Sequence, residues 1–465
     1  MKLSTVAVSV IAVVGVASVG GSWYTGKLAE EKYNEIIELA NQNLKSLGMY
    51  GMEAQIKEVK FNRNFFSSDV KYELQVKSNG ETNTFIGDDK IYHGPFPLNR
   101  LSKGNIVPVM MSAENKIAVP ESLKPRFKNE QYAVTGQSNI SYSGDVSGTV
   151  ETKPFTSEDG TLDISATQSD YDYDKSGNGN VNAKIANVKM VDVTGAVIAA
   201  EDSEYNIDFL SNKEYAYLGE GTYGVKFKTF SFSDGSLSQE SFIFNDLIAK
   251  GKNSINNGRY NSKGDFSAQL EMKSPTNVTK LGKLFMDMEM DVDAKITNDA
   301  MPYLSNENMY SAEADKAFIS VFTNAVKFNI KELSLENAKG KNNVSLALNM
   351  DKFDPNKMAN MTDFLGVFKQ SALDIKLNLA SLEELVKEAN ASQGMEKELA
   401  EQQAKLIVNE LVNSAQSSGT ALVDSESIKF NLSIDNGKVS LNGRDVPQEE
   451  VERELIMLMM GFGGL

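Results

Sequence analysis

Beyond its first fifty residues, the chain is dominated by alternation of apolar and polar positions. Apolar side chains stand at every second position in residues 70–76, 266–272, 284–296, 344–350 and 375–379. The longest of these runs, residues 284–296, has charged or polar residues at most of the positions between. A period of two with one polar face is typical of an antiparallel sheet that is covered on one side.

Near the C-terminus the same alternation predicts a hairpin. Residues 428–434 alternate up to Asn436-Gly437, and apolar residues return at Val439 and Leu441. Asn-Gly between two alternating runs favours the two-residue turn whose backbone twist matches that of paired strands.

Helical spacing interrupts the strands in four segments. Apolar residues recur every three or four positions between Lys27 and Leu47. We expect a long helix from Ser381 to about Ser414, kinked near residues 392–394, and a weaker helical stretch from Ala300 to Val326. The last helix begins at Pro447 with two glutamates in its first turn, as helix starts prefer.

The clearest signal is the N-terminus. Residues 3–24 contain no charged side chain, and about 20 apolar residues suffice for a helix that crosses a hydrocarbon core of about 30 Å. Trp23 and Tyr24 end the run, where aromatic rings favour the headgroup layer. The run predicts an uncleaved anchor, with a cleaved signal peptide as the alternative, and Lys2 before it favours a cytoplasmic N-terminus.

These patterns predict an α+β protein: a mostly antiparallel, curved β-sheet with packed helices, behind one N-terminal transmembrane helix. We divide the chain into an anchor or signal peptide, residues 1–26, and a periplasmic β-rich domain, residues 27–465. The polar stretch at residues 156–182, rich in Ser, Asp, Gly and Asn, is the best candidate for a loop or for a boundary that subdivides this domain.

Composition excludes several classes of function. Lys plus Arg number 47 against 63 Asp plus Glu, so the net charge is −16. An acidic body repels phosphate backbones, which excludes nucleic acid as a partner, and it gains nothing from anionic lipid headgroups. The chain has no cysteine, hence no disulfide, thiol nucleophile or thiolate metal site, and one histidine, hence no multi-histidine metal site.

His93, the single histidine, is the first candidate for catalysis. Imidazole titrates near neutrality and could act as a general base. The alternative interpretation is a rigid corner, because Pro95 and Pro97 fix two backbone angles, remove two donors and offer two bonds that could be cis. We favour the corner, with His93 hydrogen-bonded in it and Phe96 packed into apolar surface.

An acidic segment is the second candidate. Asp170, Asp172 and Asp174 stand at alternate positions and carry the oxygen donors that Ca²⁺ takes. In either frame of a 12-residue calcium loop, an apolar residue, Val181 or Ala183, occupies the place of the bidentate glutamate. The favoured interpretation is a solvated acidic loop that binds no metal.

Three methionines are the third candidate. Met286, Met288 and Met290 share one face of a predicted strand, where flexible thioethers line either a core or a groove for acyl chains. The terminal run Leu455–Met460 could dock on that sheet, close the groove or contact the bilayer. Carboxylate pairs suited to glycoside hydrolysis cannot be singled out among 63 acidic residues.

Four short strings carry a resemblance to a known family. GGSWYTGK at residues 20–27, HGPFPL at 93–98, ISYSGD at 140–145 and NGKVSLNG at 436–443 resemble, in order and spacing, the YdgA-like proteins of gamma-proteobacteria. The resemblance spans nearly the whole chain. It implies an inner-membrane anchor and a large periplasmic domain, and it supplies no activity, cofactor or catalytic residue.

We therefore expect a membrane-anchored periplasmic binding or structural protein of the bacterial cell envelope, not an enzyme. No catalytic, cofactor-binding or metal residues are assigned. The expected partners are the inner membrane, through residues 3–24, and an unknown envelope protein or lipid, with a homo-oligomer left open. Two alternatives are a carboxylate-based envelope hydrolase and a lipid- or amphiphile-binding protein with an apolar sheet groove.

Overall fold

The fold is known from a computed structural model. It describes residues 37, 41, 44, 52–78, 81–192, 194–212, 214–215, 217–235, 240–275, 277–304, 311–358, 361–447 and 449–451. The predicted anchor at residues 3–24, most of the predicted helix at 27–47 and the run Leu455–Met460 lie outside these residues. No helix in the described part of the chain is both long and apolar enough to cross a bilayer.

The chain divides into two compact units. Unit 1 comprises residues up to 213 together with 219–230, and unit 2 comprises 214–218, 231–304 and the residues from 311 onward. Both units consist mostly of antiparallel strands with few helices, which confirms the predicted sheet-rich fold. Residues 156–182, expected to be a loop or a boundary, lie within unit 1 and supply parts of its strands.

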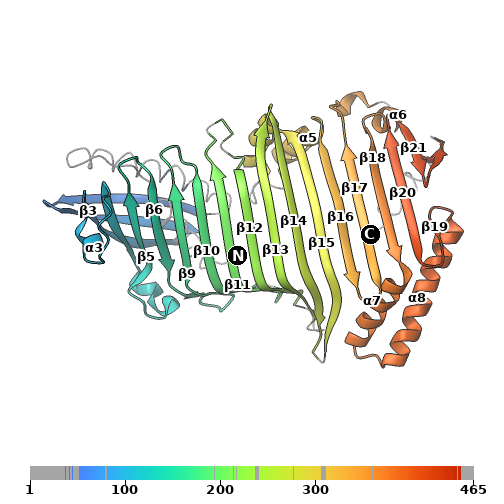
Figure 1. The fold of residues 1–465 in the computed structure, drawn as a ribbon, viewed down its shortest axis with the longest axis horizontal. Helices are drawn as coiled ribbons and strands as arrows, with labels where there is room; N and C mark the ends of the chain where they lie inside the picture. The colour runs from blue at the N-terminus through green and yellow to red at the C-terminus, as the bar shows by residue number, and fades with distance from the viewer. Residues whose placement is uncertain are drawn as a thin grey trace. The chain divides into compact units, whose positions relative to one another are not determined.

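Unit 1 is an antiparallel sheet in which β1 to β6 pair in chain order and β9, β10 and β11 continue from β6 (Figure 1). The short β7 pairs with β8, and β8 pairs with one end of β10. The elements are β1 Met52–Arg63, β2 Ser67–Ser78, β3 Glu81–His93, α3 Leu98–Leu101, β4 Met111–Ala118, η2 Glu121–Phe127, β5 Tyr132–Ile140, β6 Val146–Thr152, β7 Phe155–Thr156, β8 Leu162–Ile164, β9 Thr167–Tyr173, β10 Gly179–Val191, β11 Val197–Leu210 and β12 Glu220–Ser233, of which residues 220–230 belong to unit 1.

The alternating residues of unit 1 form a filled core. Side chains from β2, β3, β5, β6 and β9 pack with Phe127 of η2 and Phe155 of β7 into one buried apolar cluster. The rings of Phe127 and Phe155 meet edge to face at 5.1 Å between centroids. Burial of such apolar area is the main favourable term in folding, so this cluster anchors unit 1.

Two tyrosines of this core cover glycines on neighbouring strands. Tyr72 lies opposite Gly87, and Tyr171 lies opposite Gly148. A Cβ atom built on Gly87 would stand 2.1 Å from the Tyr72 ring, and one on Gly148 would stand 2.3 Å from the Tyr171 hydroxyl oxygen. Glycine therefore stands in these strands because the facing ring occupies the space of a side chain.

Unit 2 is a second antiparallel run of strands. They pair in the order β13–β14–β15–β16–β17–β18–β20–β21–β22, and β19 pairs with one end of β20. The strands are β13 Ser241–Asn256, β14 Arg259–Lys273, β15 Val278–Asp293, β16 Lys327–Asn337, β17 Gly340–Asn349, β18 Ser371–Asn378, β19 Leu422–Val423, β20 Ser427–Asp435, β21 Lys438–Leu441 and β22 Arg444–Val446. The predicted hairpin is confirmed as β20 and β21, with Asn436 and Gly437 at positive φ in the turn.

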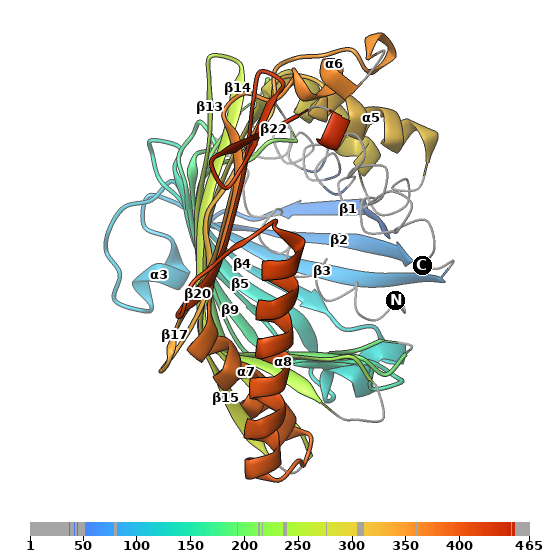
Figure 2. The same cartoon turned by 90° about the vertical axis from the view of Figure 1, so that its right-hand side faces the viewer.

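The helices of unit 2 lie at the two ends of its strands (Figures 1 and 2). α7 and α8 are beside one end, and α5 and α6 are beside the other. The long helix expected from Ser381 is confirmed as two helices that break after Ser392. The helical segments are α4 Ala294–Ala300, η3 Met301–Leu304, α5 Ala312–Phe322, η4 Pro355–Lys357, α6 Met361–Leu365, α7 Leu379–Ser392 and α8 Lys397–Ser418.

Capping residues end two strands earlier than alternation predicts. The alternating pattern in residues 284–296 extends to Ile296, but β15 stops at Asp293. The Asp293 carboxylate accepts a hydrogen bond from the Ile296 N–H and so caps the start of α4. In the same way, the Asn378 side chain accepts from the Ser381 N–H and starts α7. At the end of β15 the polar cap thus favours a helix, although two further positions continue the alternating pattern of a strand.

Candidate functional site

His93 ends β3 and holds together the turn between β1 and β2. Its Nε2 lies 3.0 Å from the Ser68 hydroxyl, its Nδ1 lies 3.4 Å from the Phe65 carbonyl oxygen, and its backbone N–H donates to the Phe66 carbonyl. The Gly94–Pro95 bond that follows is cis. Phe96 is exposed, so the expectation that it packs into apolar surface is wrong.

A serine beside a histidine has the geometry of a nucleophile and its base, so Ser68 is a candidate nucleophile. Ser68 was missed in the sequence because it stands 25 residues from His93 and the pairing of β2 with β3 brings them together. Its side chain is 0 % exposed. A substrate carbonyl could not reach the hydroxyl, so the pair acts as a structural hydrogen bond.

The acidic segment does not gather around one point. Asp170 and Asp172 lie on β9, where Asp170 accepts a hydrogen bond from the Asn182 side chain. Asp174 lies in the following turn, where its carboxylate accepts from the Asn178 side-chain amide and from the N–H groups of Asn178 and Ser176, and these bonds lower its pKa. Within the described ranges, no three acidic or histidine side chains are placed to hold a metal ion.

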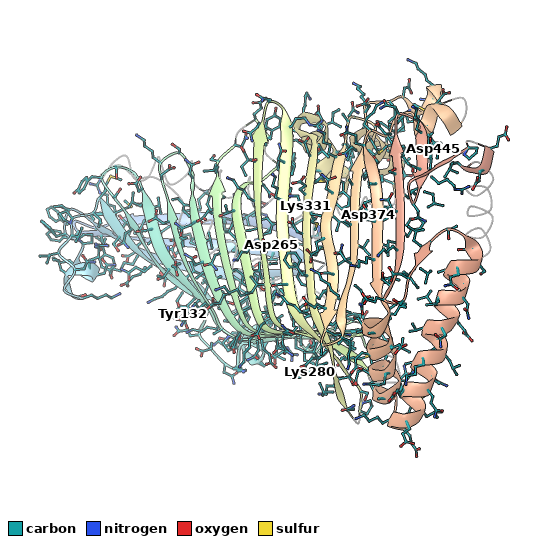
Figure 3. The ribbon with its side chains drawn as sticks, turned by 45° about the vertical axis from the view of Figure 1, so that its right-hand side comes forward. Tyr132, Asp265, Lys280, Lys331, Asp374 and Asp445 are labelled. Carbon is teal, nitrogen blue, oxygen red and sulfur yellow. The ribbon has the colours of Figure 1, made fainter. Side chains whose placement is uncertain are left out.

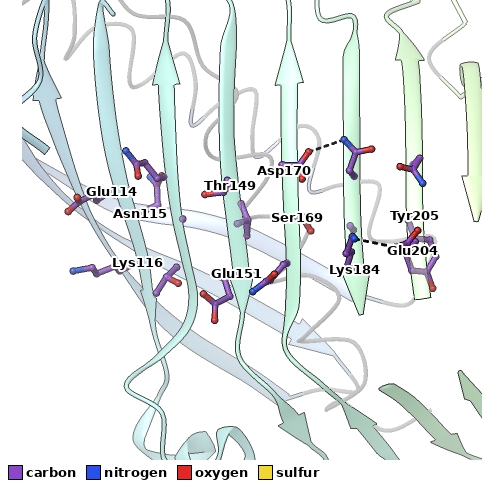
Figure 4. A pocket seen from close by; sticks show the side chains of 18 of the residues that line it. Glu114, Asn115, Lys116, Thr149, Glu151, Ser169, Asp170, Lys184, Glu204 and Tyr205 are labelled. Atoms are coloured by element: carbon purple, nitrogen blue, oxygen red, sulfur yellow. Dashed lines mark hydrogen bonds and ion pairs between the residues drawn. The ribbon is translucent and has the colours of Figure 1, made fainter. Parts of the chain in front are cut away.

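A polar hollow of about 660 Å³ lies on the open face of unit 1 (Figure 4). Strand register builds it from two rows of side chains that cross β4, β5, β6, β9, β10 and β11. One row reads Lys116, Thr135, Glu151, Gln168, Lys184, Glu204, and the other reads Glu114, Gln137, Thr149, Asp170, Asn182, Asn206.

Most carboxylates of the polar hollow already have partners. The Lys184 ammonium lies 3.2 Å from Glu204, and the Lys153 ammonium lies 2.7 Å from Glu151. Tyr92 donates a long hydrogen bond of 3.4 Å to Glu114. The contacts of Glu204 and Glu114 cross between strands and that of Glu151 lies along one strand; such contacts stabilise a solvated sheet face, and they do not single out an acid–base pair.

One buried carboxylate contacts the β4 backbone at a residue that lines this hollow. Asp89 of β3 is 5 % exposed and accepts a hydrogen bond of 3.3 Å from the Lys116 backbone N–H. Burial raises the pKa of Asp89 to about 7, against the lowering effect of its hydrogen bonds to Asn115 and Lys116. The neighbouring charge of Asp88 raises it further.

Unit 2 presents the opposite chemistry on one face, here called the apolar face. Two cross-strand rows define it. The first reads Phe266, Met286, Leu333, Val344, Ile375, Phe430, and the second reads Met288, Ile330, Leu346, Leu373, Leu432, Leu441. The three methionines singled out in the sequence thus belong to a continuous apolar surface, and Met290 continues it beside Met288.

The apolar face is half-buried along both rows. Helix α7 lies over one end of the strands, where the Asn337 and Asn342 side-chain amides donate to Ser381. The buried apolar cluster of the described residues, in contrast, lies entirely in unit 1. Every side chain of the two rows is therefore partly covered, and none is fully buried.

The reverse face of unit 2 carries charged side chains that form ion pairs across neighbouring strands. Lys331 and Lys263 lie 2.8 Å and 3.6 Å from Glu289, and the hydrogen bond from Lys331 lowers the pKa of Glu289. Asp265 and Asp374 are on the same face (Figure 3). The sheet thus has a solvated side and an apolar side, as alternation predicted.

Comparison with known proteins gives a family and no activity. A family model described as "Bacterial protein of unknown function (DUF945)" matches residues 1–449. Protein YdgA of Escherichia coli (strain K12) is 24% identical over 495 residues, which cover 97% of this chain and 96% of the relative. The resemblance to the YdgA-like family is confirmed.

Two further relatives are also described as uncharacterized. Protein YihF of Escherichia coli (strain K12) is 23% identical over 480 residues, 96% of this chain and 97% of the relative. A protein of Haemophilus influenzae is 23% identical over 337 residues, 71% of this chain and 82% of the relative. No solved structure matches the chain.

Proposed function

The chain belongs to the DUF945 family of bacterial proteins of unknown function, and we propose that it is a membrane-anchored envelope protein that binds the acyl chains of an amphiphile on the apolar face of unit 2. It acts by binding rather than by catalysis. Residues 3–24 hold it in the bacterial inner membrane, and the two units lie in the periplasm.

The observation that carries the proposal is the pair of apolar rows. Each crosses six strands, and at a strand spacing of about 4.8 Å such a row is about 24 Å long. One leaflet of a bilayer holds its acyl chains within about 15 Å, half of the hydrocarbon core. An extended chain therefore fits along a row with every methylene against apolar side chains.

The composition of the rows favours a flexible ligand segment without polar groups. Met286 is the second member of the first row and Met288 begins the second, and methionine adapts to ligands that differ in shape. Covering half-buried apolar side chains contributes about 25 cal/mol per Å² of area removed from water. Because the protein is tethered to a bilayer, the amphiphiles of that bilayer are the nearest molecules that can cover these apolar side chains.

Mass spectrometry of the full-length chain tests the proposal. After extraction in a mild neutral detergent, we expect a phospholipid or another acyl-bearing amphiphile to remain bound in near-stoichiometric amount, beyond the level found with an unrelated single-pass protein extracted alongside. Recovery of amphiphile at or below the level of that reference protein would count against acyl binding.

A further inference from the structure

We propose that unit 1 carries a separate binding site for the headgroups of anionic phospholipids, built by the connection between β3 and β4 at residues 94–110. The site is distinct from the apolar face, since it lies in the other unit and uses charge. It takes the phosphate of a headgroup in a bilayer surface, with apolar side chains of the same connection entering the interface.

The first observation is the exposed apolar character of this end of unit 1. Phe65 and Phe66, in the turn after β1, are 87% and 62% exposed, and Ile106 and Val107 are 72% and 63% exposed. The turn and the connection lie at the same end of the strands, because His93 hydrogen-bonds the carbonyls of the turn. Large apolar side chains in such number at one end of a domain mark an interaction surface.

The second observation is local charge. Residues 91–113 contain Arg100 and Lys103 and no Asp or Glu, and the turn beside them is flanked by Lys60 and Arg63 on one side and by Asp69 on the other. The rest of the chain is strongly acidic, with a net charge of −16 overall. Cations interleaved with exposed apolar residues are the composition that binds a bilayer with anionic lipids.

The third observation is a basic hollow of about 300 Å³ at the same place. Its lining includes Arg100, Lys103, Asn105, Gln137 and Asn139 and contains no carboxylate. Every partner of the two cations in it is neutral. Lys103 donates to the Gln137 side-chain oxygen over 3.0 Å, and Arg100 donates to Asn139, to Asn105 and to the Val107 carbonyl.

Arg100 is the main anion-binding residue of the proposed site, because its charge is buried without a counter-ion. The residue is 9% exposed, and its Nε is buried with no hydrogen-bond partner among the described atoms. Within the described ranges, no carboxylate stands within 4.0 Å of it or of Lys103. A buried guanidinium is destabilising unless an anion is near, and a phosphate oxygen supplies that charge with matching geometry.

The absence of cysteine from the chain allows a direct test by single-site labelling. The full-length protein with Ile106→Cys carries an environment-sensitive fluorophore and is reconstituted into vesicles of phosphatidylcholine alone or of equal parts phosphatidylcholine and phosphatidylglycerol. We expect a blue-shifted emission and reduced iodide quenching only in the vesicles with phosphatidylglycerol. The matched control is Glu158→Cys. The Glu158 side chain is 87% exposed at the opposite end of the unit 1 strands, so a label there should respond to neither composition.

The charge is tested by Lys103→Gln in the labelled background. Lys103 is exposed, so the substitution should leave the fold intact and weaken docking in phosphatidylglycerol vesicles about fivefold, the contribution expected of one lysine at such a surface. Arg100→Gln should weaken it more. Equal quenching of the labels at 106 and 158 in both compositions would overturn the proposal.

Free phosphate is the competing source of the same anion. Titration of the labelled chain in neutral detergent with inorganic phosphate should give no response, or one at far higher concentration than vesicles require. A response to phosphate that depends on Arg100, without a response to vesicles, would also overturn the lipid assignment. Met288→Lys on the apolar face should leave the emission shift and the iodide quenching of the label at residue 106 unchanged. A failure of the headgroup proposal can therefore be distinguished from a failure of the acyl-binding proposal.

Discussion

Replacing Met288 with Lys is expected to remove most of the amphiphile that copurifies with the full-length chain. Met288 begins the second row of the apolar face and lies beside Met286 of the first row, between Gly264 and Ile330 on the neighbouring strands. A bound acyl chain would have to cover the new ammonium group, and burying an unpaired charge against hydrocarbon costs at least about 2 kcal/mol, or about 30-fold in affinity. The measurement is the molar ratio of amphiphile to protein by mass spectrometry after identical extraction.

The chain offers a matched control one residue away. Asp287→Lys makes a similar side chain on the same strand, but on the charged face, where Asp287 lies opposite Asp265 and Glu332. A lysine there gains two acidic neighbours and should leave the amphiphile ratio unchanged. Equal loss in both variants would mean that the strand had been disturbed rather than the binding surface, and no loss in either would contradict acyl binding.

Unfolding measured against pH is expected to show a falling stability between pH 5 and pH 8, with Asp89 as its cause. The folded-state pKa of Asp89 is raised to about 7 from an ordinary value of 3.8. Between those values the folded chain holds a proton that the unfolded chain has released, so stability falls as pH rises and stops falling above about 7. The loss across the range from pH 5 to pH 8 should be about 3 kcal/mol.

Asp89→Asn isolates this effect. The amide cannot ionise and its oxygen can still accept from the Lys116 N–H, so the variant should lose the slope and be more stable than the wild type at pH 8. The carboxylates with lowered pKa, such as Glu289 and Glu332, stay ionised in the folded chain across this range, and because their ordinary pKa is 4.5 they add a rising slope only at its acid end. Parallel profiles for the two proteins would show that Asp89 is not the group responsible.

Alternation alone predicted much of the sheet, and local chemistry explains where it failed. The strands around residues 70–76, 266–272 and 344–350 formed as expected, because period two and one polar face leave few alternatives. The residues missed at strand ends are caps: Asp293 and Asn378 start helices by accepting backbone N–H groups. Their side chains compete with the ladder, which a count of apolar positions does not register.

The candidate sites were less predictable because register decides them. The sequence identified the methionine run on β15, but the apolar face depends on six strand pairings, three of which bring Ile330, Leu346 and Leu373 beside that run. Ser68, the partner of His93, stands on a different strand. Neither the apolar face nor the contact between Ser68 and His93 can be predicted before the strands are paired.

The proposed headgroup site departs from the expectation about lipid surfaces that was drawn from net charge. A total of −16 argues against anionic headgroups only if charge is spread evenly over the chain. Residues 91–113 were a visible exception, with Arg100 and Lys103 and no acidic residue. Their meaning appears only when folding leaves Arg100 buried without a counter-ion and Ile106 exposed beside it.

Photo-crosslinking tests the central claim, acyl binding on the apolar face, most directly. The full-length chain is reconstituted with a phospholipid that carries a diazirine on its acyl chain, irradiated, digested and sequenced by mass spectrometry. We predict adducts on peptides from β15, β16 and β17, in addition to those on residues 3–24 that an anchor would give. Adducts confined to residues 3–24, with none on the three strands, would contradict the account.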